Sequence, residues 1–342
     1  MEKNEIKSKK KILILATGGT LASKMGENGL TPQITPEEIL RFIPTAKEIY
    51  EIDAISVFSI DSTDVTQKHW SVLAGEIEKD YEKYDGFLII HGTDTLAYTA
   101  SAVSYMIQNS KKPIVLTGSQ LPIDKEKTDA KDNILNSLIY AVDDDSHNVS
   151  VVFDGKVIAG TRARKEKAKS FDAFSSLNYP VKAEVKGGKL IRYIPDELPE
   201  NDVIFYKDMS DSVCTLKLIP GIRPIIFPYL FEHYDAIVIE SFGLGGMPEN
   251  LYDAFCNQME KWKDKGKTIV ITTQVSKEGS DMSVYEVGRK IKDNFNILES
   301  FDMTFEATVT KLMWILGRGI NDAKTIKSEF YNEINKDILK VN

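Results

Sequence analysis

Two threonines follow short apolar segments of the chain and could act as nucleophiles. Thr20 closes the segment Thr17-Gly18-Gly19-Thr20, and Thr93 stands inside His91-Gly92-Thr93-Asp94-Thr95. A threonine hydroxyl is a weak nucleophile, so its attack on an amide needs a neighbouring group that takes up the proton. The developing oxyanion needs hydrogen-bond donors, which the backbone N–H groups around both threonines could supply. These residue types indicate a hydrolase.

A third segment of this kind, Thr117-Gly118-Ser119-Gln120, follows another apolar run. In open parallel sheets, ligands bind beyond the carboxyl ends of the strands, so three such loops at one edge would form a polar pocket. A single loop of glycine and threonine is more often only a turn, and the three together favour a site. None of them has the spacing of a phosphate-binding loop. The glycine-rich segment Gly243–Gly246 leads into Pro248 and predicts a tight turn.

The elements that would position these loops can be read from the apolar pattern. Continuous runs of valine, isoleucine and leucine are typical of strands buried on both faces of a parallel sheet. Such runs occur at Ile12–Ala16, Phe87–Ile90, Ile114–Leu116, Val149–Phe153, Ala236–Ile239 and Thr268–Thr272. Amphipathic helix spacing occurs at Thr66–Tyr84, Thr95–Asn109 and Asp129–Ala141. The alternation predicts an α/β fold with a doubly wound, mostly parallel sheet.

The length of 342 residues suits about two domains. Residues 1–191 hold the three loops and predict a larger N-terminal domain. Residues 192–212 contain Pro195, Pro199 and several acidic side chains, a composition typical of a linker. Residues 213–342 predict a smaller C-terminal α/β domain.

Composition narrows the class of partner. The formal net charge of −8 argues against nucleic acid or an anionic membrane as the main partner. Cys214 and Cys256 allow one disulfide, and no Cys/His cluster has metal-ligand spacing. The apolar run Ile12–Ala16 behind Lys9–Lys11 is shorter than the roughly 7–15 residues of a signal-peptide core. We therefore expect a first strand there and a cytoplasmic protein, without a membrane span.

Seven segments carry a resemblance to a known family. The first two loops resemble the two signatures of bacterial L-asparaginases, and the chain is similar to the type I, cytoplasmic branch and its Bacillus enzymes. The segments are Ala16–Ser23, Ile60–Asp64, His91–Ala100, Leu116–Gln120, Ser170–Phe174, Ile239–Gly243 and Glu306–Leu312. The resemblance extends from about Lys11 to Gly317.

The resemblance implies a two-domain asparaginase fold that assembles as a homodimer or as a homotetramer of two intimate dimers. Each active site would lie between the N-terminal domain of one subunit and the C-terminal domain of its partner. The implied reaction converts L-asparagine and water to L-aspartate and ammonia, with no cofactor or metal. Nucleic acid and membrane are not implied as partners.

The resemblance also assigns catalytic roles residue by residue. Thr20 matches the nucleophile that would form an acyl-enzyme, and Thr93, Asp94 and Lys165 match a second catalytic trio that would handle protons. Lys165 is placed between Gly160-Thr161-Arg162 and Ser170-Phe171-Asp172, with Arg164 and Lys167 as neighbours one or two residues away. From the residues alone, Arg162–Lys169 reads as a solvated charged surface. A lysine could serve as a base if burial lowers its pKa, or through a proton relay by Thr93.

Substrate-binding roles follow in the same way. Asp61, Ser62, Thr63 and Gly92 match binding positions, and Asp94 also matches the residue that holds the α-amine of the substrate. Ser119 matches a position whose backbone approaches the side-chain amide. His91 is interpreted as a structural residue that fixes its loop.

Two positions depart from the family pattern. Many asparaginases have a tyrosine in the mobile loop after the first signature, where this chain has Leu30 in the segment Met25–Pro32. Tyr285 could replace that hydroxyl, reaching in from the neighbouring subunit, or it could merely pack. Some type I enzymes bind a second asparagine through an arginine and a cysteine, where this chain has Glu240 and Val275. We therefore expect little homotropic cooperativity.

Three other functions stay open from the sequence. A glutaminase–asparaginase of relaxed specificity differs by one methylene of substrate, which a pocket discriminates only weakly. An amidase subunit acting on charged tRNA would need an extra N-terminal domain and a basic surface. A non-catalytic amino-acid-binding protein would not need both Thr20 and the Thr93–Asp94 pair.

Overall fold

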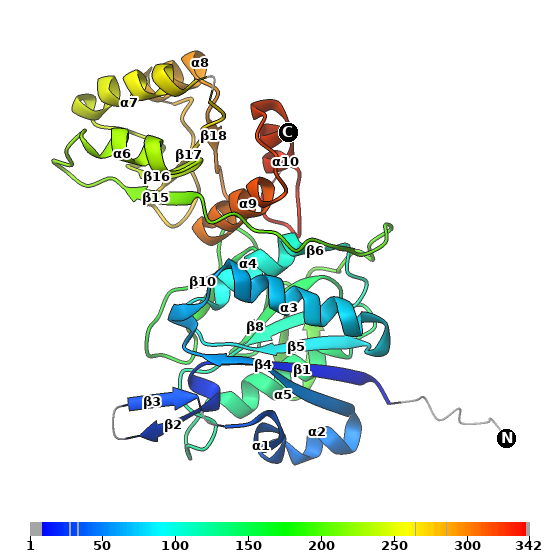
Figure 1. The fold of residues 1–342 in the computed structure, drawn as a ribbon. Coiled ribbons are helices and arrows are strands. Elements are labelled where there is room, and N and C mark those ends of the chain that lie inside the picture. The colour runs from blue at the N-terminus through cyan, green and yellow to red at the C-terminus, as the bar shows by residue number, and fades with distance from the viewer. Residues whose placement is uncertain (1–8, 27–28, 33, 264, 285, 340–342) are drawn as a thin grey trace. The chain divides into compact units, whose positions relative to one another are not determined.

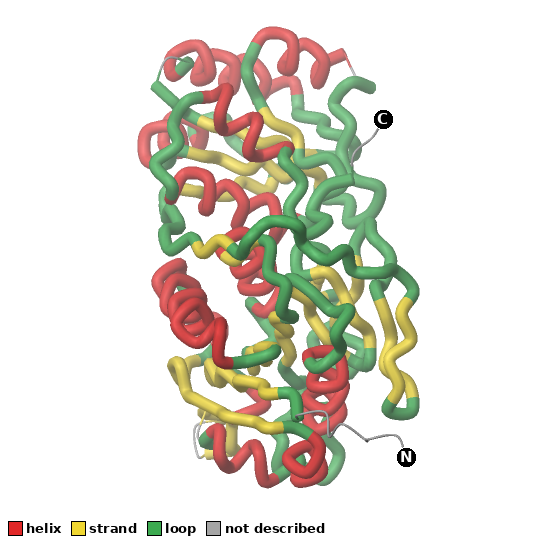
Figure 2. Tube along the Cα trace, turned by 90° about the vertical axis from the view of Figure 1, so that its right-hand side faces the viewer, coloured by secondary structure: helices red, strands yellow, loops and turns green. Residues whose placement is uncertain are grey.

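The computed structural model describes residues 9–26, 29–32, 34–263, 265–284 and 286–339. The chain forms two compact units (Figure 1). The first comprises Met1–Ser176 and Pro180–Lys207, and the second Leu177–Tyr179 and Asp208–Asn342. Both contain helices and strands, which Figure 2 distinguishes by colour. An α/β fold with a large, mostly parallel sheet is confirmed.

The first unit is built around an eight-stranded sheet of order β13-β12-β9-β8-β7-β5-β1-β4. Its parallel strands are β4 (Glu51–Ile60), β1 (Lys11–Gly18), β5 (Gly86–Ile90), β7 (Ile114–Thr117) and β8 (Val149–Phe153). Four of these contain the predicted runs, and β5, β7 and β8 are buried along their whole length. The sheet therefore brings the carboxyl ends of β1, β5 and β7 to one edge.

Antiparallel pairs extend the sheet beyond the prediction. These strands are β9 (Lys156–Ala159), β12 (Ala183–Lys186) and β13 (Lys189–Arg192). Small two-stranded sheets accompany it, namely β2 (Ser23–Gly26) with β3 (Gly29–Pro32), β10 (Ala163–Lys165) with β11 (Phe174–Ser176), and β6 (Ile107–Gln108) with β14 (Ile204–Phe205). β14 thus lies within the stretch that the sequence predicts as a linker.

Helices cover both faces of the sheet. α3 (Gln67–Asp80) and α4 (Leu96–Met106) lie on one face, and α5 (Ala130–Ala141) lies on the other with α1 (Pro36–Arg41) and α2 (Pro44–Ile49) (Figure 1). The predicted helices at Thr66–Tyr84, Thr95–Asn109 and Asp129–Ala141 are confirmed as α3, α4 and α5. Short 3-10 turns, η1 (Thr20–Ala22), η2 (Ser62–Asp64) and η3 (Tyr81–Lys83), begin or end other segments.

A buried ionic network fastens residues 192–196 to the first unit. Lys182 Nζ lies 2.7 Å from Asp196 Oδ1, with 4% and 11% of the two side chains exposed. Lys182 also donates to Tyr140 Oη and Ser150 Oγ, both at 2.9 Å. With every partner satisfied, such a pair is costly to break, because removing one member leaves a buried charge.

The second unit has a parallel four-stranded sheet of order β15-β16-β17-β18. Its elements are β15 (Val213–Lys217), α6 (Ile226–His233), β16 (Ala236–Ser241), α7 (Glu249–Trp262), β17 (Thr268–Thr273), α8 (Glu286–Asn294), β18 (Leu298–Glu299), α9 (Phe305–Gly317) and α10 (Ala323–Tyr331). The predicted runs in β16 and β17 form the centre of this sheet. Gly243–Gly246 forms the predicted tight turn, closed by the bridge of Phe242 to Gly246. Cys214 and Cys256 are free thiols.

Candidate active site

A polar pocket of the first unit lies where β1, β4 and β5 end. It is lined by Gly19, Thr20, Ser23, Asp61, Ser62, Gly92, Thr93 and Asp94. Six of these residues were predicted as site residues from the sequence, whereas Gly19 and Ser23 were not. Both belong to the first signature, Ala16–Ser23, and this membership is the sequence feature from which they could have been predicted.

The loops after β1 and β5 pack backbone against backbone. Gly19 has φ +78°, and a Cβ atom built there would overlap the backbone of Gly92. A Cβ atom at Gly92 would lie 2.6 Å from Ser62 Oγ. Only glycine permits these approaches, which bring Thr20 and Thr93 to one pocket.

Thr20 opens the turn η1, whose other residues, Leu21 and Ala22, are buried. Ser23 Oγ donates to Gly19 O at 2.8 Å, and Thr17 Oγ1 donates to Ile90 O at 2.9 Å. These bonds fix the backbone on both sides of Thr20. Within the described part of the chain, no hydrogen bond to the Thr20 hydroxyl is found, so this hydroxyl is available to a ligand.

Lys165 joins the second threonine and its neighbouring carboxylate. Lys165 Nζ donates to Thr93 Oγ1 at 2.8 Å and to Asp94 Oδ1 at 2.6 Å. Its side chain is 19% exposed, against 58% for Asp94. The structure therefore brings Lys165 to Thr93 and Asp94, and the catalytic role of this lysine stays a prediction.

The solvated charged surface suggested for Arg162–Lys169 is wrong for the first half of that segment. Arg162 is fully buried, and Lys165 is half-buried in β10, whereas residues 166–169 are exposed. The first half is buried or half-buried because β10 packs against α4. The charged residue types, which are similar in both halves, do not reveal this packing.

The loop after β4 provides a carboxylate and a hydroxyl. Asp61 Oδ1 caps η2 by accepting from Thr63 N and Thr63 Oγ1, both at 2.9 Å. Ser62 is 4% exposed, and its carbonyl accepts from Thr95 Oγ1 at 2.7 Å. Asp61 and Ser62 line the pocket, whereas Thr63 is exposed and does not line it.

Ser119 lies in the third loop but does not line the pocket. Its side chain is buried, and its hydroxyl donates to Leu121 O. The next residue, Gln120, places its Oε1 atom 3.5 Å from Thr93 Oγ1. Gln120 is the last residue of the third loop motif, and no role in the site was predicted for it from the sequence.

His91 is a fully satisfied buried residue. Its Nδ1 atom is 2.8 Å from Gly92 O, and its Nε2 atom is 3.0 Å from Thr99 Oγ1, which accepts from Trp70 Nε1 at 2.9 Å. A carbonyl can only accept, so Nδ1 carries the proton and Nε2 accepts from Thr99. Burial lowers the pKa of His91 to about 4, with the Gly92 bond opposing it. The expected structural role agrees with this geometry.

Two residues of interest cannot be placed by their side chains. Tyr285 lies outside the described residues. Leu30 lies in β3, opposite Met25 of β2, in a hairpin that directly follows η1.

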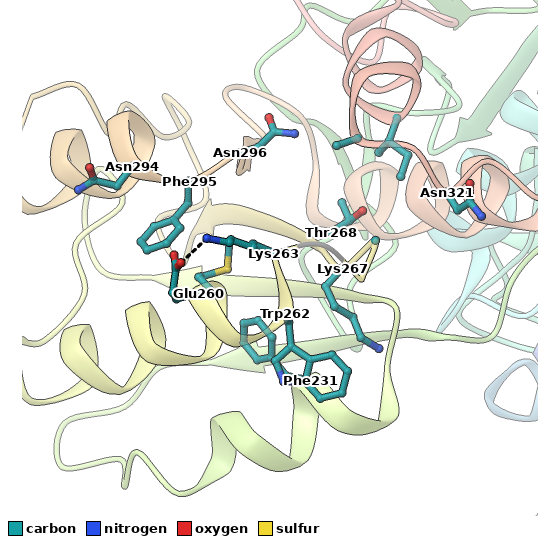
Figure 3. A pocket seen from close by; sticks show the side chains of 14 residues that line it. Phe231, Glu260, Trp262, Lys263, Lys267, Thr268, Asn294, Phe295, Asn296 and Asn321 are labelled. Atoms are coloured by element: carbon teal, nitrogen blue, oxygen red, sulfur yellow. Dashed lines mark hydrogen bonds and ion pairs between the residues drawn. The ribbon is translucent and has the colours of Figure 1, made fainter.

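A larger pocket lies within the second unit and contains no threonine pair (Figure 3). Its two lysines are already engaged. Lys263 pairs with Glu260, and Lys267 donates to Tyr234 O at 2.8 Å. The chemistry of the first unit's pocket is therefore the better candidate. The described residues include no cluster of histidine, cysteine or carboxylate side chains suited to a metal ion, and no helix among them could span a membrane.

Comparisons with known proteins agree over nearly the whole chain. A family model described as Asparaginase, N-terminal matches residues 11–196, and one described as Glutaminase/Asparaginase C-terminal domain matches residues 212–330. The L-asparaginase of Thermococcus kodakarensis is 36% identical over 312 residues, which cover 90% of this chain and 93% of that protein. A solved structure of the thermostable L-asparaginase from that organism aligns with a TM-score of 0.90 and 34% identity, covering 97% of this chain and 100% of the other.

Two other relatives carry different names, one an L-asparaginase and one an amidotransferase subunit. L-asparaginase 1 of Escherichia coli K12 is 32% identical over 329 residues, covering 93% of this chain and 95% of that protein. A glutamyl-tRNA(Gln) amidotransferase subunit of Methanosphaera stadtmanae is 34% identical over 349 residues, covering 97% of this chain and 76% of that protein.

Proposed function

The chain belongs to the asparaginase family, and we propose that it is an amidohydrolase that converts L-asparagine to L-aspartate and ammonia. The observation that carries this proposal is the pocket in which Thr20 and Thr93 meet, with Lys165 bound to both Thr93 and Asp94. A nucleophile and a neighbouring group that carries its proton are the parts that amide hydrolysis needs. The L-asparaginases among the relatives support the choice of substrate.

In the proposed reaction, Thr20 is the nucleophile. Its Oγ1 atom attacks the side-chain amide carbon and its proton passes to a base. The base returns this proton to the amide nitrogen, the C–N bond breaks, and the nitrogen leaves as ammonia. The resulting ester joins the aspartyl group to Thr20. Water then attacks the ester carbon, releases L-aspartate and restores the Thr20 hydroxyl. Thr93, Asp94 and Lys165 manage the protons of these steps, and backbone N–H groups beside the threonines hold the oxyanion.

The charges around the pocket suit an amino-acid substrate. Asp61 and Asp94 line the pocket and offer carboxylates to an α-ammonium group, with Asp94 as its main partner. Ser62 and Gly92, which line the pocket, bind the rest of the amino-acid backbone. Thr63 and Ser119 are outside its lining, and their roles, substrate binding and a backbone contact to the side-chain amide, rest on the family resemblance alone. Tyr285 supplies the hydroxyl that other asparaginases place at the position of Leu30.

The finer parts of the assignment are also proposals. We place the chain nearest the type I Bacillus enzymes and in the cytoplasm. We propose an N-terminal domain of residues 1–191, a linker of 192–212 and a C-terminal domain of 213–342 that completes the site of a neighbouring subunit in a homodimer or homotetramer. No cofactor or metal enters the proposed reaction.

Steady-state release of ammonia from asparagine and from glutamine tests the proposed function. One methylene of substrate is worth about 1–3 kcal/mol, so we expect kcat/KM for asparagine to be about 10- to 200-fold higher. Equal values would favour the glutaminase–asparaginase of relaxed specificity. Binding of asparagine without any ammonia release would favour an amino-acid-binding protein and contradict the proposal.

A further inference from the structure

The Gln120 side chain spans two loops of the first unit. Its Nε2 atom donates to Lys167 O and to Ser170 O, each at 3.1 Å, while its Oε1 atom faces Thr93 Oγ1 at 3.5 Å. Two carbonyl oxygens can only accept hydrogen bonds, so the amide nitrogen must point toward them. The orientation of the amide is thereby fixed, and its oxygen must face Thr93.

This orientation gives the Thr93 hydroxyl an acceptor at 3.5 Å, a longer contact than an ordinary O–H···O bond. Lys165 Nζ donates to Thr93 Oγ1 at 2.8 Å. An ammonium has no lone pair, so the Thr93 hydroxyl cannot donate back to it and needs a different acceptor. Gln120 Oε1 stands at that place. The glutamine therefore contacts the trio through its oxygen and the segment that carries Lys165 through its nitrogen.

The backbone of Gln120 is held rigidly from the other side. Asp129, which is 6% exposed, accepts from Gln120 N at 2.9 Å and from Leu121 N at 3.1 Å. Asn133, which is 1% exposed, donates to Gly118 O at 2.9 Å and to Asp129 at 3.2 Å. Asn133 lies within α5, and Asp129 directly precedes that helix. The third loop is thus clamped to a helix that packs on the main sheet.

β10, which carries Lys165, packs against α4, but the connection that follows it lacks such support. β10 and β11 form a two-stranded sheet separate from the main one, and the chain between them is exposed from residue 166 to residue 172. The two carbonyls bound by Gln120 belong to this exposed connection. Gln120 therefore ties the exposed connection of the β10–β11 hairpin to the third loop, close to the point where Lys165 contacts Thr93.

We propose that Gln120 is a positioning residue, which holds the β10–β11 hairpin so that Lys165 stays on Thr93 and Asp94. The proposal rests on the proposed function for its effect on catalysis, but its structural part stands on the two carbonyl bonds. A misplacement of about 1 Å at a reacting group can cost about 10²-fold in rate. We therefore expect Gln120→Met, which keeps the size and removes the amide, to lower kcat by about 10- to 100-fold.

The matched control is Gln108→Met. Gln108 also donates its Nε2 atom to a carbonyl, that of Tyr105 at 2.9 Å, beyond the far end of α4 from the pocket. We expect Gln108→Met to keep the wild-type kcat. In Gln120→Met, KM for asparagine should change less than about 3-fold, because Asp61 and Ser62 lie on another loop. Gln120→Glu, which cannot donate to the carbonyls, should also lower kcat and replaces Gln120→Met if that variant does not fold.

Two further readouts separate positioning from a general structural role. In the Lys165→Met background, Gln120→Met should lower kcat no further, because the two residues act through one another. Hydrogen exchange of the amides in residues 163–173 should speed up in Gln120→Met and stay unchanged in Gln108→Met.

Each outcome decides the proposal. If the wild type releases ammonia but Gln120→Met matches Gln108→Met in kcat, the positioning role is wrong and the proposed function stands. A full additional loss in the Lys165→Met background would also overturn it. If the wild type releases no ammonia, the proposed function fails, and hydrogen exchange alone decides whether Gln120 holds the hairpin.

Discussion

At the scale of single residues, Lys165 connects the two parts of the proposed chemistry. Its ammonium contacts a hydroxyl at 2.8 Å and a carboxylate at 2.6 Å, and 19% of its side chain is exposed. The carboxylate holds the cation in place, while the hydroxyl gives it a path for a proton. Such a bridging position is sensitive to any change of side chain.

Lys165→Met should lower kcat by about 10²- to 10⁴-fold, the usual contribution of a group that transfers protons. KM for asparagine should change less, because Asp61 and Ser62 remain in the pocket. Steady-state ammonia release measures both constants. Lys167→Met is the control, since Lys167 is exposed and pairs with Asp172. A larger loss in Lys167→Met than in Lys165→Met would mean that the catalytic lysine is misplaced by two residues.

His91 predicts a pH dependence of stability. Its pKa is lowered from 6.5 to about 4 by burial, so the unfolded chain binds a proton between these values and the folded protein does not. Stability should therefore fall as the pH drops below 6.5, by about 2 kcal/mol at pH 5 relative to pH 7.5. Urea unfolding of wild type and His91→Asn at the two pH values measures the difference.

His233→Asn serves as the matched control for this pH effect, because His233 is exposed at the end of α6. That variant should keep the wild-type difference between the two pH values, whereas His91→Asn should lose most of it. A pH dependence that survives in His91→Asn would show that another group titrates.

At the scale of elements, the site depends on how closely the loops after β1, β4 and β5 approach one another. Fully buried strands were predictable because both of their faces carry apolar residues, as in Phe87–Ile90. β4 escaped prediction because it is an edge strand of the sheet, with exposed residues at intervals along it. The short antiparallel strands β12 and β13 contain lysines and a glutamate, which weaken the apolar pattern.

Gly92→Ala should damage both stability and activity. The added Cβ atom would lie 2.6 Å from Ser62 Oγ and 2.7 Å from Ser62 Cβ, so the loops must move apart. Overpacking of this kind costs about 1–3 kcal/mol. Urea unfolding and ammonia release measure the two effects.

Gly75→Ala is the control for this substitution. A Cβ atom at Gly75, within α3, would have no atom within 4 Å, so the same change should be neutral or stabilise by up to about 1 kcal/mol. If Gly92→Ala retained wild-type stability and turnover, the close packing of the two loops would not matter to the site.

At the scale of the whole molecule, residue types and periodicity were enough to predict the two threonine loops and their sheet edge. They were not enough to predict that Lys165 contacts Thr93. Lys165 lies 72 residues from Thr93 along the chain, in a charged segment that looks solvated, and only the family resemblance identified it. Gln120 received no role for a similar reason, since its contacts to Lys167 and Ser170 depend on a hairpin that local patterns do not place.

A prediction at this scale concerns how the reaction rate responds to the concentration of asparagine. Glu240 is half-buried in β16, and Val275 is 52% exposed, where some relatives are expected to carry an arginine and a cysteine for a second asparagine. Neither side chain offers a positive charge to the carboxylate of a second asparagine. Initial rates should therefore rise hyperbolically with the concentration of asparagine. A Hill coefficient near 1 is expected, and one above about 1.5 would show that a second site survives.

The proposed function depends above all on the attack of Thr20 on the amide of asparagine, and ammonia release by Thr20→Ala measures this step. We expect kcat to fall by at least about 10⁴-fold, as when the nucleophile of another hydrolase is removed. Thr20→Ser, which keeps a hydroxyl, should retain measurable turnover, and Thr45→Ala, an exposed change in α2, should match wild type. If Thr20→Ala keeps its fold, shown by an unchanged melting temperature, and still releases ammonia at a rate near that of wild type, Thr20 is not the nucleophile.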